Sequence, residues 1–445
     1  MKLTKGSSKI TKVRARSRGR WLKWLSPGLR VKRWLLLSVL GIALVLLGIA
    51  ISARLTPVLN IGRLVSRLVD VLVDLLPRHI SGPIAIVLGL VLFWWGQRRI
   101  MQSVVDTVSP ATKDDLVDAL FADRQLRRGA KIVAIGGGTG LSNLLRGLKK
   151  YSANITAIVT VADDGGSSGR LRREQGILPP GDIRNCLTAL ADEEKLVTEL
   201  FQYRFTAGEG LSGHSFGNLF LAAMTDITGD LQKAIAASSQ VLAVRGTVLP
   251  ATLEQMVLWA DLADGRHIEG ESNITKAGGK IINFGCYPPS PKAVPEAIRA
   301  IAEADLIVIG PGSLYTSIIP NLLVPEILHA LCTRQAPAIY VCNIMSQKGE
   351  TDGYQASDYV KVLDSLAQTR LFDAILVQKE PPSPEILEHY HQTGSHFTQL
   401  DREELHHLEC PIISANVMKV RNDGTVCHDP ERLAGVLMRW YNSQY

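Results

Sequence analysis

The chain has 445 residues, enough for one large domain or two moderate ones with appendages, and its net charge is +7 at pH 7. The charge is unevenly spread, because residues 1–33 hold twelve Lys/Arg and no acid, which leaves 37 basic and 42 acidic residues elsewhere. This excludes a basic nucleic-acid-binding face on the folded domain. The six cysteines form no Cys-x-x-Cys pair, so no zinc site is indicated and a reducing, cytoplasmic setting is expected for the main domain.

The N-terminal region predicts attachment to a membrane. Residues 34–53 are twenty uncharged, mostly apolar residues, the length of a membrane-spanning helix, and residues 80–96 form a second, shorter candidate. The second run ends in three aromatic residues followed by arginines, which is typical of a helix end at the cytoplasmic face. With the basic tail of residues 1–33 inside the cell, we expect one or two transmembrane helices in a hairpin of residues 34–96. A signal peptide is disfavoured because the first run is long and lacks a clear cleavage site.

The membrane hairpin would hold the main domain at the cytoplasmic face of the inner membrane.

Residues 97–128 indicate a linker, and a nucleotide-binding domain is expected over residues 129–445. Helix-patterned stretches separate most of the strand candidates of this domain, which predicts an α/β fold with a mostly parallel sheet covered on both faces. Between residues 241 and 286, short alternating runs predict a small antiparallel insertion. The strand candidates are residues 131–135, 155–162, 305–309, 338–342, 374–377 and 411–414.

A glycine loop follows the first predicted strand. Residues 136–140 read Gly-Gly-Gly-Thr-Gly, and leucines at helical spacing come next. A strand, a glycine turn and a helix start together direct backbone N–H groups and the positive helix end at a phosphate. The match to G-x-G-x-x-G is incomplete because residue 141 is leucine. Asp163 lies 23 residues beyond Gly140, close to the spacing of the acid that reaches a ribose in dinucleotide folds.

The second predicted strand ends in an acidic and glycine-rich segment. Residues 163–170 read Asp-Asp-Gly-Gly-Ser-Ser-Gly-Arg. The two carboxylates can hold a ribose hydroxyl or a magnesium ion, and Arg170 can meet a phosphate. The alternative is an ordinary exposed turn, since Gly, Ser and Asp are common loop residues.

A stiff turn, Leu-Pro-Pro-Gly-Asp-Ile-Arg-Asn, covers residues 178–185 and leads into a predicted helix. In one interpretation Asp182 only caps that helix. In the other, Asp182, Arg184 and Asn185 are presented to a ligand from the helix start.

Another helix start is predicted at residues 213–218, Gly-His-Ser-Phe-Gly-Asn. His214 and Asn218 are four residues apart and would share a helix face. A histidine with a structural role is the alternative to one that contacts a ligand.

Two more strand ends carry glycine or polar residues: residues 310–317 follow the strand at 305–309, and Asn343 follows the strand at 338–342. Because the carboxyl ends of parallel strands lie at one edge of a sheet, we expect four such joins to form one crevice. The candidate ligand-binding residues are Gly136, Gly137, Gly138, Thr139, Gly140, Asp163, Asp164, Ser167, Ser168, Gly169, Arg170, Asp182, Arg184, Asn185, His214, Asn218, Gly310, Gly312, Ser313, Tyr315 and Asn343.

These segments resemble the gluconeogenesis-factor (YvcK) family, which is related to the 2-phospho-L-lactate transferases (CofD-like) of deazaflavin cofactor synthesis. The resemblance covers about residue 131 to the C terminus, whereas the membrane-anchored N-terminal third departs from the family pattern. It rests on the segments at residues 135–141, 162–171, 178–185, 213–219, 310–318 and 342–347.

The resemblance implies a Rossmann-like α/β domain in a regulatory protein that binds the sugar nucleotide UDP-N-acetylglucosamine. Its role would lie in cell shape, envelope growth and growth on gluconeogenic carbon sources, with envelope-synthesis or regulatory proteins as partners. Association into a homo-oligomer is compatible with the fold, but no sequence feature fixes it.

The alternative implied by the resemblance is a magnesium-dependent transferase similar to 2-phospho-L-lactate transferase. Asp163 and Asp164 would then hold magnesium on a diphosphate, the glycines of residues 136–140 would cradle phosphates, and His214 or Asp182 would assist an acceptor hydroxyl. A dinucleotide-dependent oxidoreductase fits the first two loops, but no hydride-acceptor site is evident. No catalytic residue and no certain cofactor is assigned.

Overall fold

The computed structural model describes residues 124–192 and 194–444. The expected basic tail, both expected membrane spans and nearly all of the expected linker lie outside the described residues, and the domain boundaries stay predictions. Among the described residues, no single helix has the length and apolar character to cross a membrane, and one pair bent by 82°, Leu314–Leu322 with Pro325–Cys332, qualifies by length and composition alone.

The predicted parallel sheet is confirmed. In the described part of the chain, seven strands form one sheet in the order β10-β9-β8-β7-β1-β2-β3, and every neighbouring pair is parallel. This is the doubly wound order 3-2-1-4-5-6 with one further strand. The strands are β1 (Ile132–Gly136), β2 (Ile155–Val159), β3 (Thr247–Pro250), β7 (Leu306–Ile309), β8 (Ala338–Val341), β9 (Ala374–Gln378) and β10 (Ile412–Ala415).

Continuous apolar runs form these strands because the sheet is covered on both faces. β1 is buried along its whole length. Its side chains alternate between two hydrophobic cores: Val133 and Ile135 belong to one, and Ile132 and Ala134 to the other.

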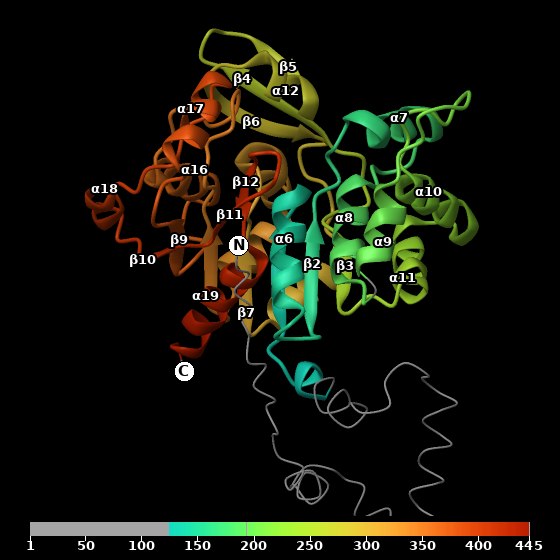
Figure 1. Ribbon diagram of the computed structural model, residues 1–445, viewed down its shortest axis with the longest axis horizontal. Coiled ribbons are helices and arrows are strands. Elements are labelled where there is room, and N and C mark those ends of the chain that lie inside the picture. The colour runs from blue at the N-terminus through green and yellow to red at the C-terminus, as the bar shows by residue number, and fades with distance from the viewer. Residues whose placement is uncertain (1–123, 193, 445) are drawn as a thin grey trace, which may run out of the picture. The chain divides into compact units, whose positions relative to one another are not determined.

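Helices cover the two faces of the sheet (Figure 1). On one face α6, α8, α11 and α19 carry the buried leucines and isoleucines, α9 and α10 pack beside α8, and α7 reaches α10. The helices of this side are α6 (Gly138–Leu148), α7 (Gly166–Gln175), α8 (Gly181–Leu190), α9 (Glu194–Gln202), α10 (Phe216–Thr228), α11 (Leu231–Val241) and α19 (Pro430–Asn442).

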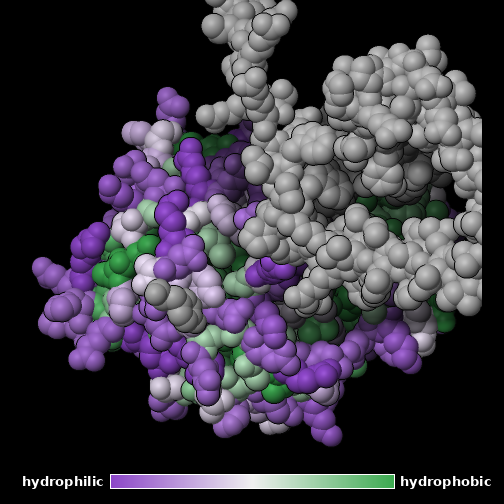
Figure 2. Space-filling view, turned by 90° about the horizontal axis from the view of Figure 1, so that it is seen from below, coloured by the Kyte–Doolittle hydropathy of each residue, from purple (hydrophilic) through white to green (hydrophobic). Residues whose placement is uncertain are grey.

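The opposite core is closed by α13, α15, α16 and α18 together with the π-helical turn η1 and the short α14. Seen from below, the described surface is mostly hydrophilic, with small scattered hydrophobic areas (Figure 2). The elements of this second group, with α17, are α13 (Pro295–Ala302), η1 (Leu314–Ile318), α14 (Ile319–Leu322), α15 (Pro325–Cys332), α16 (Ala356–Ala367), α17 (Pro384–Gln392) and α18 (Arg402–His407).

The predicted antiparallel insertion exists, but its start was wrong. Three strands, β4 (Val257–Leu262), β5 (His267–Glu269) and β6 (Ile281–Tyr287), form a separate antiparallel sheet in the order β5-β4-β6, with α12 (Glu271–Ala277) between β5 and β6. The expected first run of this insertion contains Thr247–Pro250, which is instead the parallel edge strand β3 beside β2. A short alternating run does not reveal its partner, and here the partner lies some 90 residues earlier in the chain.

A second antiparallel pair, β11 (Met418–Val420) with β12 (Val426–His428), was not predicted. Its strands have only three residues each, too few to show a period. The β12 strand contacts α6 and so reaches the carboxyl end of the main sheet.

Candidate functional site

The strand order reverses between β1 and β7, so the loops that follow these two strands lie on either side of the switch point. They approach very closely. A Cβ atom on Gly140 would lie 2.5 Å from the backbone carbonyl oxygen of Pro311, so only glycine fits there. Both loops also line the crevice expected from the strand ends.

Helix α6 points its N terminus into this crevice. Its N-cap, Gly137, has an extended backbone and no side chain that could cap the helix. Gly138 has a φ of +63°, which favours glycine. A Cβ on Gly137 would lie 2.6 Å from Oδ2 of Asp182. The first-turn N–H groups of a helix have no partners within the helix. Here the N-cap glycine supplies no capping side chain, although the N–H of Gly138 bonds to the carboxylate of Asp182. The arrangement can receive an anion.

A cavity of about 620 Å³ opens at this end of the sheet, a volume within the range of small-molecule sites. Its walls come from the strand ends, from α12 of the insertion and from the C-terminal hairpin. Of the sequence-predicted residues, those that line it are Gly137, Gly138, Thr139, Gly140, Asp163, Asp182, Gly312, Ser313 and Asn343.

Three carboxyl groups share one part of the cavity wall: Asp163, Asp182 and Glu271. Burial, and then the charge of Asp163, raises the pKa of Asp182 to about 6, although the backbone N–H of Gly138 opposes the shift. Burial, again followed by Asp163, raises the pKa of Glu271 to about 8. At neutral pH, Glu271 is therefore mostly protonated, and the wall carries less negative charge than three carboxylates would give.

The adjacent acids Asp163 and Asp164 have different surroundings. Asp163 lines the cavity, and its Oδ1 accepts a hydrogen bond from the N–H of Gly165 at 2.9 Å. Asp164 Oδ1 instead accepts from the N–H of Ser272 at 2.9 Å, in the first turn of α12. Among the described residues, no group of three or more His, Cys, Asp or Glu is arranged to hold a metal ion. The pair expected to bind magnesium is thus divided between the cavity and the insertion.

The expected shared helix face of His214 and Asn218 is not formed, because α10 begins after its N-cap Ser215 and His214 precedes it. Both side chains nevertheless reach adjacent serines of α7. A ring nitrogen of His214 lies 3.0 Å from Ser167 Oγ, and Asn218 donates to Ser168 Oγ at 3.3 Å. None of these four residues lines the cavity, and together they join α7 to α10.

Arg184 extends this polar network to α8. Its guanidinium donates to Ser215 Oγ at 2.6 Å, to Asn218 Oδ1 at 3.0 Å and to Asn185 Oδ1 at 2.9 Å. Asp182 does not cap α8 through its side chain, since the N-cap is Pro180 and Asp182 stands in the first turn, facing the glycine loop. Within this segment, only Asp182 lines the cavity.

The remaining predicted residues lie away from the cavity wall. Arg170 donates to the carbonyl of Ser212 at 2.8 Å, and Tyr315 shares a hydrogen bond of 2.9 Å with Tyr354 inside the core. Three of the predicted glycines lie in backbone positions outside the cavity wall. Gly136 ends β1, Gly169 lies within α7, and Gly310 turns the chain after β7 with a φ of +78°.

Several lining residues were missed by the sequence reasoning. Gln347 and Lys348 follow β8 a few residues after Asn343, so extending the strand-end rule would have found them. Glu271, on the insertion, and His428, on β12, had no such signal. His428 is buried, which lowers its pKa to about 4; its ring bonds to the backbone of Cys342, and its Nε2 has no partner among the described residues.

The chain has close relatives of known sequence and structure. The CofD family model, described as 2-phospho-L-lactate transferase CofD, matches residues 132–418. A putative gluconeogenesis factor of Nostoc sp. (strain PCC 7120) is 60% identical over 426 residues, 96% of this chain and 93% of that protein. The gluconeogenesis factor of Bacillus subtilis (strain 168) is 50% identical over 308 residues, 69% of this chain and 97% of that protein. A crystal structure of a Bacillus halodurans protein, 47% identical, covers 70% of this chain and 100% of its own with a TM-score of 0.68.

Proposed function

Because this chain belongs to the gluconeogenesis factors of the CofD family, we propose that it is a regulatory protein that binds a sugar nucleotide, UDP-N-acetylglucosamine, in the cavity at the switch point. The observation that carries the proposal is the convergence of the α6 N terminus and the Gly312–Ser313 loop on a cavity of about 620 Å³. In this assignment the diphosphate lies against the first-turn N–H groups of α6.

The carboxyl groups of the cavity suit the hydroxyl-rich part of such a ligand. Asp163 can accept hydrogen bonds from sugar hydroxyls, and a protonated Glu271 can donate one. The pKa of about 8 for Glu271 also matters for the diphosphate, because a neutral Glu271 reduces repulsion of the anion. Lys348, on the same cavity wall, brings a positive charge.

The cellular part of the proposal is regulatory. The named relatives are gluconeogenesis factors, which supports a role in growth on gluconeogenic carbon sources. A role in cell shape and envelope growth, through envelope-synthesis or regulatory partners, rests on the family resemblance. The apolar runs of residues 34–53 and 80–96 support a tether at the inner membrane with the main domain in the cytoplasm.

The second candidate is a magnesium-dependent transferase, favoured by the match of residues 132–418 to the lactate-transferase model. Magnesium is commonly held by one or two carboxylates together with substrate phosphates, where it neutralises charge. Asp163 is the member of the expected pair that could supply such a carboxylate, because Asp164 is turned to α12.

Calorimetric titration of the full-length protein separates these candidates. UDP-N-acetylglucosamine, NAD and guanine nucleotides are titrated in turn, with and without magnesium. We expect saturable binding of the UDP-sugar, and its absence would refute the first proposal. Turnover of a phospholactyl donor onto an added acceptor would establish the transferase instead.

A further inference from the structure

Helix α12 carries two residues of the cavity wall, Glu271 and Thr275, although it does not belong to the main fold. It has seven residues, and isolated helices of that length are not stable in water. Its place over the sheet end therefore depends on contacts with other elements.

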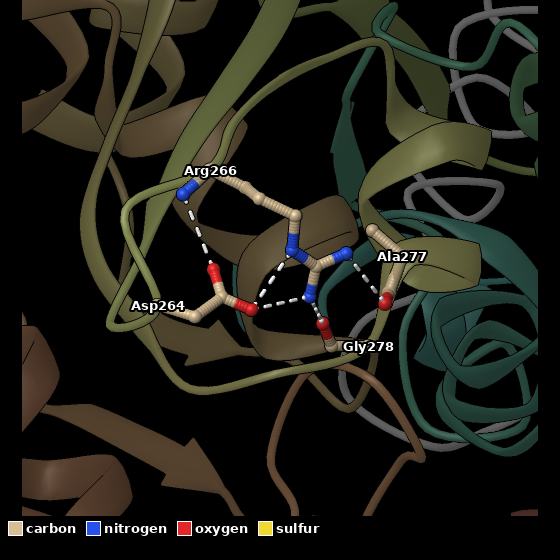
Figure 3. Close-up of polar contacts among 4 residues, drawn as sticks. All are labelled: Asp264, Arg266, Ala277 and Gly278. Atoms are coloured by element: carbon tan, nitrogen blue, oxygen red, sulfur yellow. Dashed lines mark hydrogen bonds and ion pairs between the residues drawn. The ribbon is translucent and has the colours of Figure 1, made fainter.

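Both ends of α12 are held by charged side chains. At the N-terminal end, Asp164 accepts from the N–H of Ser272 at 2.9 Å. At the C-terminal end, Arg266 donates to the carbonyls of Ala277 at 3.2 Å and Gly278 at 2.8 Å, while Asp264 orients its guanidinium (Figure 3). Negative charge at the start and positive charge at the end of a helix both complement its dipole.

A third carboxylate, Glu350, joins α12 to the π-helical turn η1, which follows β7. Its Oε1 accepts from Thr275 Oγ1 at 3.1 Å and from Thr316 Oγ1 at 3.2 Å. The backbone N–H groups of Tyr315 and Thr316 also bond to this carboxylate. Thr275 and Thr316 line the cavity, whereas Glu350 does not. The carboxylate therefore lies one layer behind the wall and connects two segments of it.

The loop that carries Glu350 fits closely against the helix. A Cβ on Gly349 would lie 2.3 Å from the carbonyl oxygen of Thr275, so the loop backbone touches the α12 backbone. Glu350 itself is 3% exposed, and its Oε2 has no hydrogen-bond partner among the described residues. An unpartnered buried carboxylate oxygen is unfavourable for stability, so packing alone gives a poor reason for an acid at this position.

We propose that Glu350 is a positioning residue, which fixes α12 against the π-helical turn η1 and so sets the affinity of the cavity without touching its ligand. The effect on affinity rests on the proposed function, while the fixing of α12 does not. Glutamine at this position keeps an oxygen that accepts from both threonines, whereas alanine keeps none.

The test uses the full-length protein and three variants: Glu350→Ala, Glu350→Gln and, as a control, Lys276→Ala on the exposed side of α12. Amide hydrogen exchange is measured over residues 271–277 without ligand, and affinity for UDP-N-acetylglucosamine is measured by calorimetry. In Glu350→Ala we expect exchange faster by about tenfold or more and binding weaker by about tenfold, because both hydrogen bonds accepted from Thr275 and Thr316 are lost. Glu350→Gln should stay within about threefold of wild type because the acceptor oxygen remains, and Lys276→Ala should match wild type.

The positioning role would be overturned if residues 271–277 of Glu350→Ala exchanged at the wild-type rate while β1 was equally protected in both proteins. A Glu350→Gln variant as mobile in α12 as the alanine variant would also overturn it. If Glu350→Ala does not fold, Thr275→Val removes one of the two hydroxyl donors and must raise exchange in α12 for the proposal to stand. A wild-type protein that does not bind the UDP-sugar refutes the proposed function, and the exchange measurement still decides the role of Glu350.

Discussion

Replacing Gly140 by alanine is expected to force apart the two glycine loops at the switch point. The added Cβ would lie 2.5 Å from the carbonyl oxygen of Pro311 and 3.2 Å from Cα of Gly312, both backbone atoms that cannot rotate away. Restoring an ordinary contact of 3.4 Å requires the loops to separate by about 0.9 Å. Overpacking of this kind typically costs about 1–3 kcal/mol.

The same displacement widens the end of the cavity assigned to the diphosphate. A melting temperature lower by several degrees is expected, at about 2–4 °C per kcal/mol. We also expect affinity for UDP-N-acetylglucosamine to fall about tenfold or more, as each 1.4 kcal/mol corresponds to a factor of ten. The measurements are thermal unfolding and calorimetric titration of the full-length protein.

Gly136→Ala provides a matched control, since Gly136 ends β1 outside the cavity wall and a Cβ there would meet its nearest neighbours at 3.8 Å. Stability and affinity close to wild type are expected for that variant. If Gly140→Ala melts and binds like Gly136→Ala, the close approach of the two loops is not what shapes the site.

The other predictions concern the acidic residues and His428. The pKa of Glu271 rises from 4.5 to about 8 on folding, so the folded state becomes less stable as the pH rises through that interval. Glutamine does not titrate, and the melting temperature of Glu271→Gln should therefore fall less than that of wild type between pH 5 and 8.5. Asp163→Asn should weaken binding of the UDP-sugar about tenfold. Asp164→Asn should keep its affinity within about threefold of wild type, because its amide oxygen still accepts from the N–H of Ser272. Equal losses of affinity in calorimetry would contradict the different roles of the two acids. The pKa of His428 falls to about 4, so its imidazole should remain neutral in NMR titrations down to pH 5, and protonation near pH 6.5 would argue against its burial.

Much of the sheet could be predicted because strands buried on both faces are continuous apolar runs. Six of the seven parallel strands lie where such runs predicted them, with ends shifted by a few residues. β3 was assigned to the insertion because four residues at a sheet edge carry no sign of which strand they join. The antiparallel insertion was recognised from its alternation, but its position over the cavity depends on tertiary hydrogen bonds that no local pattern displays.

The site was predictable where it follows directly from strand ends. The glycines after β1, Asp163 after β2, Gly312 after β7 and Asn343 after β8 all line one cavity, because parallel strands end at the same edge. Polar residues at helix starts were less informative. His214 and Arg184 face neighbouring polar groups rather than the cavity, and a sequence does not tell which way such side chains turn.

The pairing of β1 has a consequence for how the protein folds during synthesis. Ile132 lies beside Ile155 on one side and beside Leu306 on the other, at sequence separations of 23 and 174 residues. Pairings of such long range form slowly, and until β7 has left the ribosome the backbone N–H and C=O groups along one edge of the apolar strand β1 have no strand beside them. Unpaired strand edges of this kind invite aggregation. A chain that stops before Leu306 is therefore expected to be insoluble or dependent on chaperones, even though it contains both the first glycine loop and the acidic segment that follows β2.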